Sequence, residues 1–162
     1  MAQMYPTGEK SQAELALAQL EEKLREIIAL GQRRRDFVRA LDARRELTLR
    51  IACSIAAERY ITVAEAEEYI DVGSAELRPV KGRPFKPTEE IREMLGRLRS
   101  ISARIADCPW STPEDADSDI TARIHRLVED SKPLREGPDG PAVTDRLMTL
   151  AKSLSGGDNI QY

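Results

Sequence analysis

Two groups of cationic side chains are the part of this sequence best suited to chemistry, because arginine and lysine bind carboxylates and phosphates. One group lies in a long segment without helix breakers, and the other lies in a segment with three prolines. The two groups are Arg33, Arg34 and Arg35, and Lys81, Arg83 and Lys86. They predict a surface that binds an acidic partner, either a protein or a nucleic acid.

Two aromatic residues beside prolines extend this prediction. Phe85 lies between two prolines, and Trp110 follows another. Each is either an exposed anchor for a partner or a local hydrophobic plug, and we include Phe85 in the predicted partner-binding surface. The residues before it, Lys-Gly-Arg-Pro at 81–84, are also typical of a hook that inserts an arginine into a DNA minor groove. They therefore keep nucleic-acid binding open as an alternative.

Residue types that bind metals are sparse. His125 is the only histidine, and neither Cys53 nor Cys108 has a second ligand at metal-binding spacing. The sequence also contains no glycine-rich phosphate loop. We therefore expect no metal and no cofactor, and we expect Cys53 to be a small buried side chain on an apolar helix stripe.

Three segments resemble the helices of one enzyme family. Residues 41–47 read Leu-Asp-Ala-Arg-Arg-Glu-Leu, residues 89–93 read Glu-Glu-Ile-Arg-Glu, and residues 120–131 follow them with a third helical pattern. In this order they are similar to the all-helical chorismate mutase family, over residues 37–136 of this chain.

The resemblance implies an intertwined helical dimer and, as an alternative function, the isomerisation of chorismate or an inactive relative of that enzyme. It places Arg44 at the arginine of the family's first helix. Glu89, Arg92 and Glu93 correspond to the family's Asp-x-x-Arg-Glu motif, with glutamate in place of the aspartate. The family's glutamine position falls on Arg135, and its lysine position falls on an isoleucine.

Helix breakers divide the chain into predicted elements. Residues 9–72 hold no proline and one glycine, Gly31, so we expect a long helix that opens with a capping box at 11–14. Gly31 marks either a bend into a helical hairpin or a position inside a continuous helix. A continuous helix is favoured because one glycine inside a helix lowers its stability by only about 1 kcal/mol relative to alanine. A second capping box at 62–65 predicts a short helix that ends near residue 72.

The C-terminal half is predicted to hold three helices. The prolines of residues 77–87 exclude a helix there and favour an extended, exposed connector. Thr88 caps the next helix, Pro113 opens another, and a turn rich in glycine and proline precedes the last. We expect Ala116, Ile120, Ile124, Leu127 and Val128 to form the buried face of their helix. No alternation of apolar and polar residues is long enough to predict a strand.

The predicted fold class is all-α: an elongated helical bundle with a long N-terminal helix or helical hairpin and coiled-coil-like contacts between subunits. We divide the chain into a flexible N-terminus, a long-helix oligomerisation region, a proline-rich basic connector, a C-terminal three-helix region and a flexible tail. These segments span residues 1–10, 11–72, 73–87, 88–154 and 155–162.

Composition excludes several classes of protein. Charged residues make up 33% of the chain and the net charge is -3, which is not the balance of a generally basic nucleic-acid binder. No apolar run reaches the roughly 18 residues that a membrane span needs, so we expect no membrane association. The expected location is the cytoplasm or a particle assembled there.

The apolar stripe of the long helix is longer than the short C-terminal helices should be able to cover, which predicts a homo-oligomer. The predicted interface consists of Leu17, Leu20, Leu24, Ile27, Phe37, Leu41, Ile51 and Ile55. The sequence therefore favours a non-enzymatic scaffold, adaptor or assembly protein that binds an acidic partner. The mutase-like enzyme and the nucleic-acid-binding protein are the alternatives.

Overall fold

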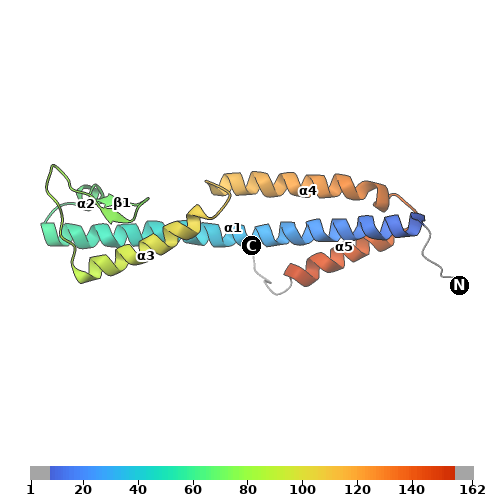
Figure 1. Ribbon diagram of the computed structural model, residues 1–162, viewed down its shortest axis with the longest axis horizontal. Helices are drawn as coiled ribbons and strands as arrows, with labels where there is room; N and C mark the ends of the chain where they lie inside the picture. The colour runs from blue at the N-terminus through green and yellow to red at the C-terminus, as the bar shows by residue number, and fades with distance from the viewer. Residues whose placement is uncertain (1–7, 156–162) are drawn as a thin grey trace. The chain divides into compact units, whose positions relative to one another are not determined.

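Helices make up most of the fold, and one very short hairpin interrupts them (Figure 1). The computed structural model describes residues 8–155. The elements are α1 (Gly8–Arg59), α2 (Val63–Glu67), β1 (Ile70–Asp71), β2 (Glu76–Leu77), α3 (Glu89–Ala106), α4 (Pro113–Arg135) and α5 (Gly140–Ser155). The predicted all-α class and long N-terminal helix are confirmed. The predicted flexible ends, 1–10 and 155–162, lie largely outside the described residues.

The first helix, α1, continues through Gly31 without a break and is 52 residues long. A Cβ atom added at Gly31 would meet nothing within 4 Å, so no close approach requires glycine there. The favoured continuous helix is therefore confirmed, and the helical hairpin is wrong. The helix begins at Gly8, three residues before the capping box predicted at 11–14. None of the described helices is long and apolar enough to cross a lipid bilayer.

A Schellman motif ends α1 and reverses the chain. Tyr60 adopts a left-handed conformation with φ of 57°, and the amide of Ile61 donates to the carbonyl of Ala56 at 3.1 Å. The side chain of Ile61 is partly buried against the adjacent core. The polypeptide that follows α1 is thereby directed back along it.

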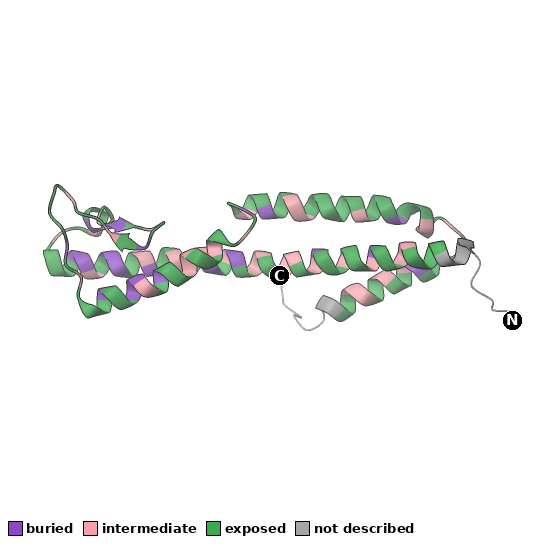
Figure 2. Ribbon diagram, in the orientation of Figure 1, coloured by how far each residue is buried: buried purple, intermediate pink, exposed green. Residues whose placement is uncertain are grey.

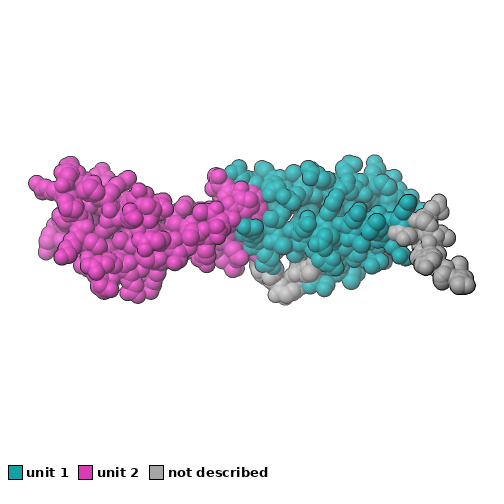
Figure 3. All heavy atoms as spheres, viewed as in Figure 1, with its two compact units in different colours: residues 1–33, 114–162 teal, residues 34–113 magenta. Residues whose placement is uncertain are grey.

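The described chain forms two compact units, and each contains part of α1 (Figure 3). Unit 1 combines Met1–Arg33 with Glu114–Tyr162, which includes α4 and α5. Unit 2 is Arg34–Pro113, which includes α2, the hairpin and α3. These units cut across the segments predicted from the sequence.

The core of unit 2 forms where α3 and the hairpin segment pack against α1 (Figure 2). Ile51 and Ile55 of α1 and Leu98 of α3 have no exposed surface. The remaining buried residues of this cluster are Leu47, Ala52, Ala56, Ala66, Ile70, Ala75, Phe85, Ile91, Met94 and Leu95. Thr88 caps α3 as predicted, since its hydroxyl accepts from the amide of Ile91.

The segment between α1 and the connector differs from its prediction. The capping box is confirmed: Thr62 accepts from the amide of Glu65 at 3.0 Å, and the Glu65 carboxylate accepts from the amide of Thr62 at 3.3 Å. However, α2 ends at Glu67, and a hairpin pairs Ile70 with Leu77 and Asp71 with Glu76. No strand was predicted from the sequence, so this hairpin was missed. Strands of two residues are too short to show an alternating pattern.

In unit 1, α4 and α5 pack against the first part of α1. Leu20 and Ile27 are buried there, with exposures of 4% and 9%. Ion pairs join α1 to both helices: Lys23 lies 3.0 Å from Asp130, and Glu21 lies 3.4 Å from Arg146. The predicted buried face of α4 is only partly correct, because Ile124 and Val128 remain 42% and 51% exposed.

The apolar stripe predicted to form the interface between subunits is largely covered within the single chain. Five of its eight residues are buried within the single chain, namely Leu20, Ile27, Phe37, Ile51 and Ile55. The other three, Leu17, Leu24 and Leu41, are half-buried. The chain's own later helices cover the stripe, so no second subunit is needed to hide it. Cys53 was expected on the buried stripe, but it is exposed.

Replacing Ile51 with alanine should lower the free energy of unfolding by about 2–5 kcal/mol, since it opens a cavity in the core of unit 2. The matched control is Leu49→Ala, two residues earlier on α1, where the side chain is 50% exposed. That change should lower the free energy of unfolding by less than about 1 kcal/mol. Urea denaturation followed by circular dichroism measures both, and equal losses would contradict the described packing.

Candidate functional site

The proline-rich connector contains no helix, as predicted, but a tight basic turn interrupts its predicted extended form. Val80 and Arg83 exchange both backbone hydrogen bonds, at 3.2 and 3.0 Å. Between them, Lys81 and Gly82 have φ values of 55° and 74°. Positive φ at both central residues is the signature of a type I′ turn. The connector therefore presents Lys81 at a defined tip.

Phe85 anchors this turn to unit 2. Its ring is 7% exposed, and it meets the edge of Tyr69 with centroids 5.9 Å apart. The guanidinium of Arg59 lies over the same ring, 4.7 Å from its centroid, and donates to the carbonyl of Pro84 at 3.4 Å. Phe85 is therefore a plug that holds the turn, and its predicted role as an exposed anchor is wrong.

The cations around this plug point into solvent. Lys81, Arg83 and Lys86 are exposed, as is Arg59 at the end of α1. We call these four residues the basic turn. Arg78 fixes the start of the connector, because its Nε donates to the carbonyl of Glu68 at 2.8 Å. The structure thus brings together three of the predicted partner-binding cations and adds Arg59, which the sequence analysis did not select.

The arginine triplet of the predicted surface lies elsewhere on α1. Arg33 belongs to unit 1, whereas Arg34 and Arg35 belong to unit 2. Arg33 is exposed and the other two are half-buried, and each takes part in an interaction within the chain. The triplet therefore does not join the basic turn in one patch within unit 2.

Trp110 is also a plug. Its ring is 6% exposed and lies 6.0 Å from the ring of Phe37, which has an exposure of 1%. Among the described residues, no three histidine, cysteine, aspartate or glutamate side chains lie close enough to hold a metal ion.

The residues implied by the mutase resemblance do not share the groove that Arg44 lines. Arg44 lines a groove whose lining contains none of Glu89, Arg92 and Glu93. Those three lie in the first turns of α3, where Arg92 is 57% exposed and pairs locally with Glu89 at 3.5 Å. The enzymatic alternative stays a prediction, and loss of chorismate absorbance is its direct test.

Arg135, the last residue of that set, belongs to unit 1 and is bound within α4. Its Nε donates to the hydroxyl of Ser131 at 2.7 Å, and a terminal nitrogen donates to the carbonyl of Val128 at 3.0 Å. Comparison of the chain with protein-family models, with curated proteins and with solved structures finds no match. A function has to be inferred from the residues of the chain itself.

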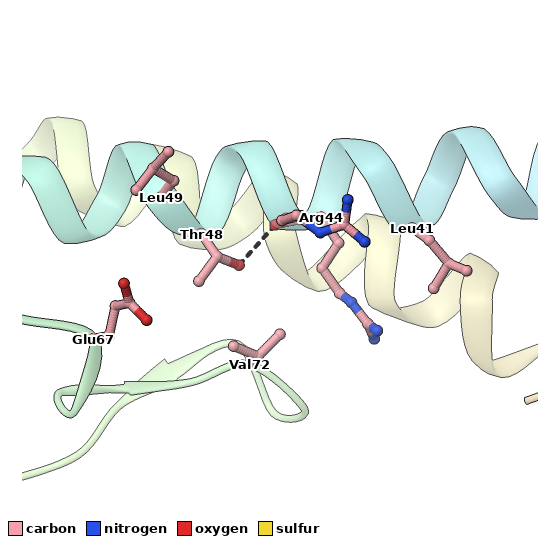
Figure 4. A pocket seen from close by; sticks show the side chains of 7 residues that line it. Leu41, Arg44, Thr48, Leu49, Glu67 and Val72 are labelled. Carbon is pink, nitrogen blue, oxygen red and sulfur yellow. Dashed lines mark hydrogen bonds between the residues drawn. The ribbon is translucent and has the colours of Figure 1, made fainter. Parts of the chain in front are cut away.

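A second feature of unit 2 is a groove beside α1, which we call the hairpin groove (Figure 4). It encloses about 370 Å³. Its lining consists of Leu41, Arg44, Arg45, Thr48 and Leu49 of α1, Glu67 of α2, and Val72 just after β1. Five of these residues were not selected as site residues from the sequence. Arg45, Thr48, Leu49 and Val72 were missed because the sequence does not show which segments pack beside this part of α1. Glu67 was missed because α2 was expected to run past it.

The turn conformation makes opposite predictions for two neighbouring substitutions. Lys81→Asn should leave stability unchanged or raise it, because asparagine tolerates a left-handed backbone and Asn-Gly favours this turn. Gly82→Val should lower the free energy of unfolding by roughly 1–2 kcal/mol, because a β-branched residue is strained at positive φ. Thermal unfolding of both variants is the measurement. If valine were tolerated as well as asparagine, the described turn would be excluded.

Proposed function

We propose that this protein is a non-enzymatic helical adaptor or scaffold that binds an acidic partner through the basic turn. The observation that carries the proposal is the anchoring of the turn: Phe85 is buried while Lys81, Arg83 and Lys86 beside it are exposed. A buried aromatic plug next to solvent-exposed cations fixes the position of the charges while leaving them open to a ligand.

Fixing these charges before binding favours association. A flexible loop loses conformational freedom when a partner orders it, whereas the cross-bridged turn has already lost that freedom on folding. Exposed cations of one sign also attract an acidic partner from a distance and raise its association rate. The turn therefore suits recognition of charge rather than catalysis.

The surroundings of the turn favour a protein over a nucleic acid as the acidic partner. The aromatic ring of the turn, Phe85, is buried and cannot stack on a base. Tyr60, next to Arg59, is 94% exposed, and tyrosine and arginine are residues that dominate the energetics of protein interfaces. Insertion of the turn into a DNA minor groove remains the second candidate, since Lys81 and Arg83 flank a narrow glycine tip.

The two units support the scaffold part of the proposal. Each unit packs its own apolar residues against a different part of α1. One chain can thereby present separate surfaces, which is the property that an adaptor requires.

Self-association is part of the proposed scaffold role, although the apolar stripe of α1 no longer gives a reason for it. Among the described residues of unit 1, the large apolar side chains left exposed are Leu15, Ile124, Val128 and Met148. Light scattering of the purified protein measures its mass, and 18.2 kDa would indicate a monomer. If the wild-type protein is a multimer and the Val128→Asp variant is a monomer, the contact between subunits lies on α4.

The double variant Lys81→Asn with Arg83→Gln should weaken binding of an acidic peptide by at least about tenfold, because it removes two exposed cations and keeps the turn. A suitable probe is a fluorescein-labelled peptide of about twenty residues rich in Asp and Glu, with affinity measured by anisotropy over a salt series. Two substitutions at exposed arginines of α3, Arg97→Gln with Arg104→Gln, form the control with the same loss of charge.

Equal weakening by the control pair would show that only net charge matters, which would exclude the basic turn as the docking point. A DNA duplex of about twenty base pairs is the second probe, since phosphate contacts give a steep dependence on salt. Binding of the duplex that exceeds peptide binding and depends on Arg83 would favour the nucleic-acid candidate.

A further inference from the structure

Arg44 occupies an unusual position for a cation. It lies seven residues after Phe37 and seven before Ile51, so these three side chains share one face of α1. The two flanking residues are 1% and 0% exposed, while Arg44 itself is half-buried. An arginine therefore occupies a position in line with the buried stripe, and its side chain is partly covered there.

The guanidinium of Arg44 has no partner within the part of the chain that the structure describes. No hydrogen bond or ion pair of its side chain is found there, although the group carries five N–H donors. The hydrogen bond drawn in Figure 4 runs from the Thr48 hydroxyl to the backbone carbonyl of Arg44, at 2.7 Å. The guanidinium of this half-buried residue is thus left to solvent and not to another group of the chain.

The other polar groups of the hairpin groove differ from Arg44 in this respect. Arg45 is 81% exposed and pairs with Asp42 at 3.5 Å. The Thr48 hydroxyl is already used as a donor. Glu67 is exposed and makes no ion pair with either arginine among the described residues. The donors of Arg44 that no group of the described chain occupies are therefore available to an acceptor that enters the groove.

We infer that the hairpin groove binds an acidic side chain of a partner protein, together with a neighbouring apolar side chain of the same segment. The carboxylate accepts two hydrogen bonds from the Arg44 guanidinium. The apolar side chain contacts Leu41, Leu49 and Val72, of which Leu49 is half-exposed. This inference rests on the proposed function in one respect, which is that the partner is an acidic protein.

Charge complementarity selects this occupant. Arg44 and Arg45 line the groove against the single carboxylate of Glu67, so the arginine end attracts an anion while the glutamate end disfavours a second one. A polyanion such as a nucleic acid would bring several charges past Glu67. A segment that alternates one acidic and one leucine-like residue at three- or four-residue spacing fits the groove better.

The experiment uses the full chain and a fluorescein-labelled helical peptide of about twelve residues, with Leu and Glu repeated at three- and four-residue spacing. Arg44→Gln should weaken its binding by at least about tenfold. Arg39→Gln, the matched control on α1 outside the groove lining, should change binding less than about threefold, because its side chain is 75% exposed. A peptide with Gln in place of every Glu should bind as weakly to the wild-type protein as the acidic peptide binds to Arg44→Gln.

A second variant separates binding from folding. Arg44→Leu completes the apolar stripe, so it should raise the urea midpoint of unfolding while abolishing peptide binding. A lower midpoint would show that Arg44 serves the fold, and it would overturn the inference.

The basic turn and the groove can fail independently. If the double variant Lys81→Asn with Arg83→Gln weakens peptide binding while Arg44→Gln does not, the inference is overturned and the proposed function stands. If only Arg44→Gln weakens peptide binding, the hairpin groove is supported as a binding site and the basic turn is not. Failure of the peptide to bind the wild-type protein also overturns the inference. Binding of a DNA duplex that depends on Arg44 does the same.

Discussion

Burial of one apolar face of α1 is the constraint on which unit 2 depends. Ile51 and Ile55 lie on that face, and a helix cannot cover its own side chains. The Schellman motif at Tyr60 reverses the chain as soon as α1 ends, and the capping box at Thr62 then starts α2. The same core receives Phe85, so the position of the basic turn depends on the packing that covers the stripe.

Apolar contacts, and not ion pairs, hold the folded-back segment against α1. Residues 60–77 carry five acidic and no basic side chains, and they lie against a part of α1 that is rich in arginine. Yet no ion pair joins this segment to α1 among the described residues. The arginines pair locally instead, as Arg45 does with Asp42, and exposed pairs of this kind contribute little stability. The opposite charges of the two segments therefore do not hold them together. The arginines of α1 that form no pair with this segment stay available for a partner.

Local signals in the sequence were sufficient for the helices and insufficient for what covers them. Thr62 and Thr88 were identified as caps because capping depends on residues three positions apart. The stripe of α1 was also identified, but its partner was assigned to a second subunit, because periodicity shows that a face is buried without showing by what. Phe85 was left open between an exposed anchor and a buried plug for the same reason. Its neighbours are prolines and cations, and its burial comes from Tyr69 and the core, which only the folded chain brings to it.

The short hairpin explains how a cation can persist on the buried face of α1. The hairpin pairs two residues on each side, and Val72 directly after β1 borders the groove beside Arg44. A longer hairpin would extend over this part of α1 and bury the guanidinium, whose charge would then need a partner within the chain. Because the hairpin stops where it does, the fold keeps Arg44 half-exposed and bears only part of the desolvation cost. The groove and the tolerated arginine are therefore consequences of the same short β-pairing, and a ligand that supplies a carboxylate would satisfy donors that the fold leaves open.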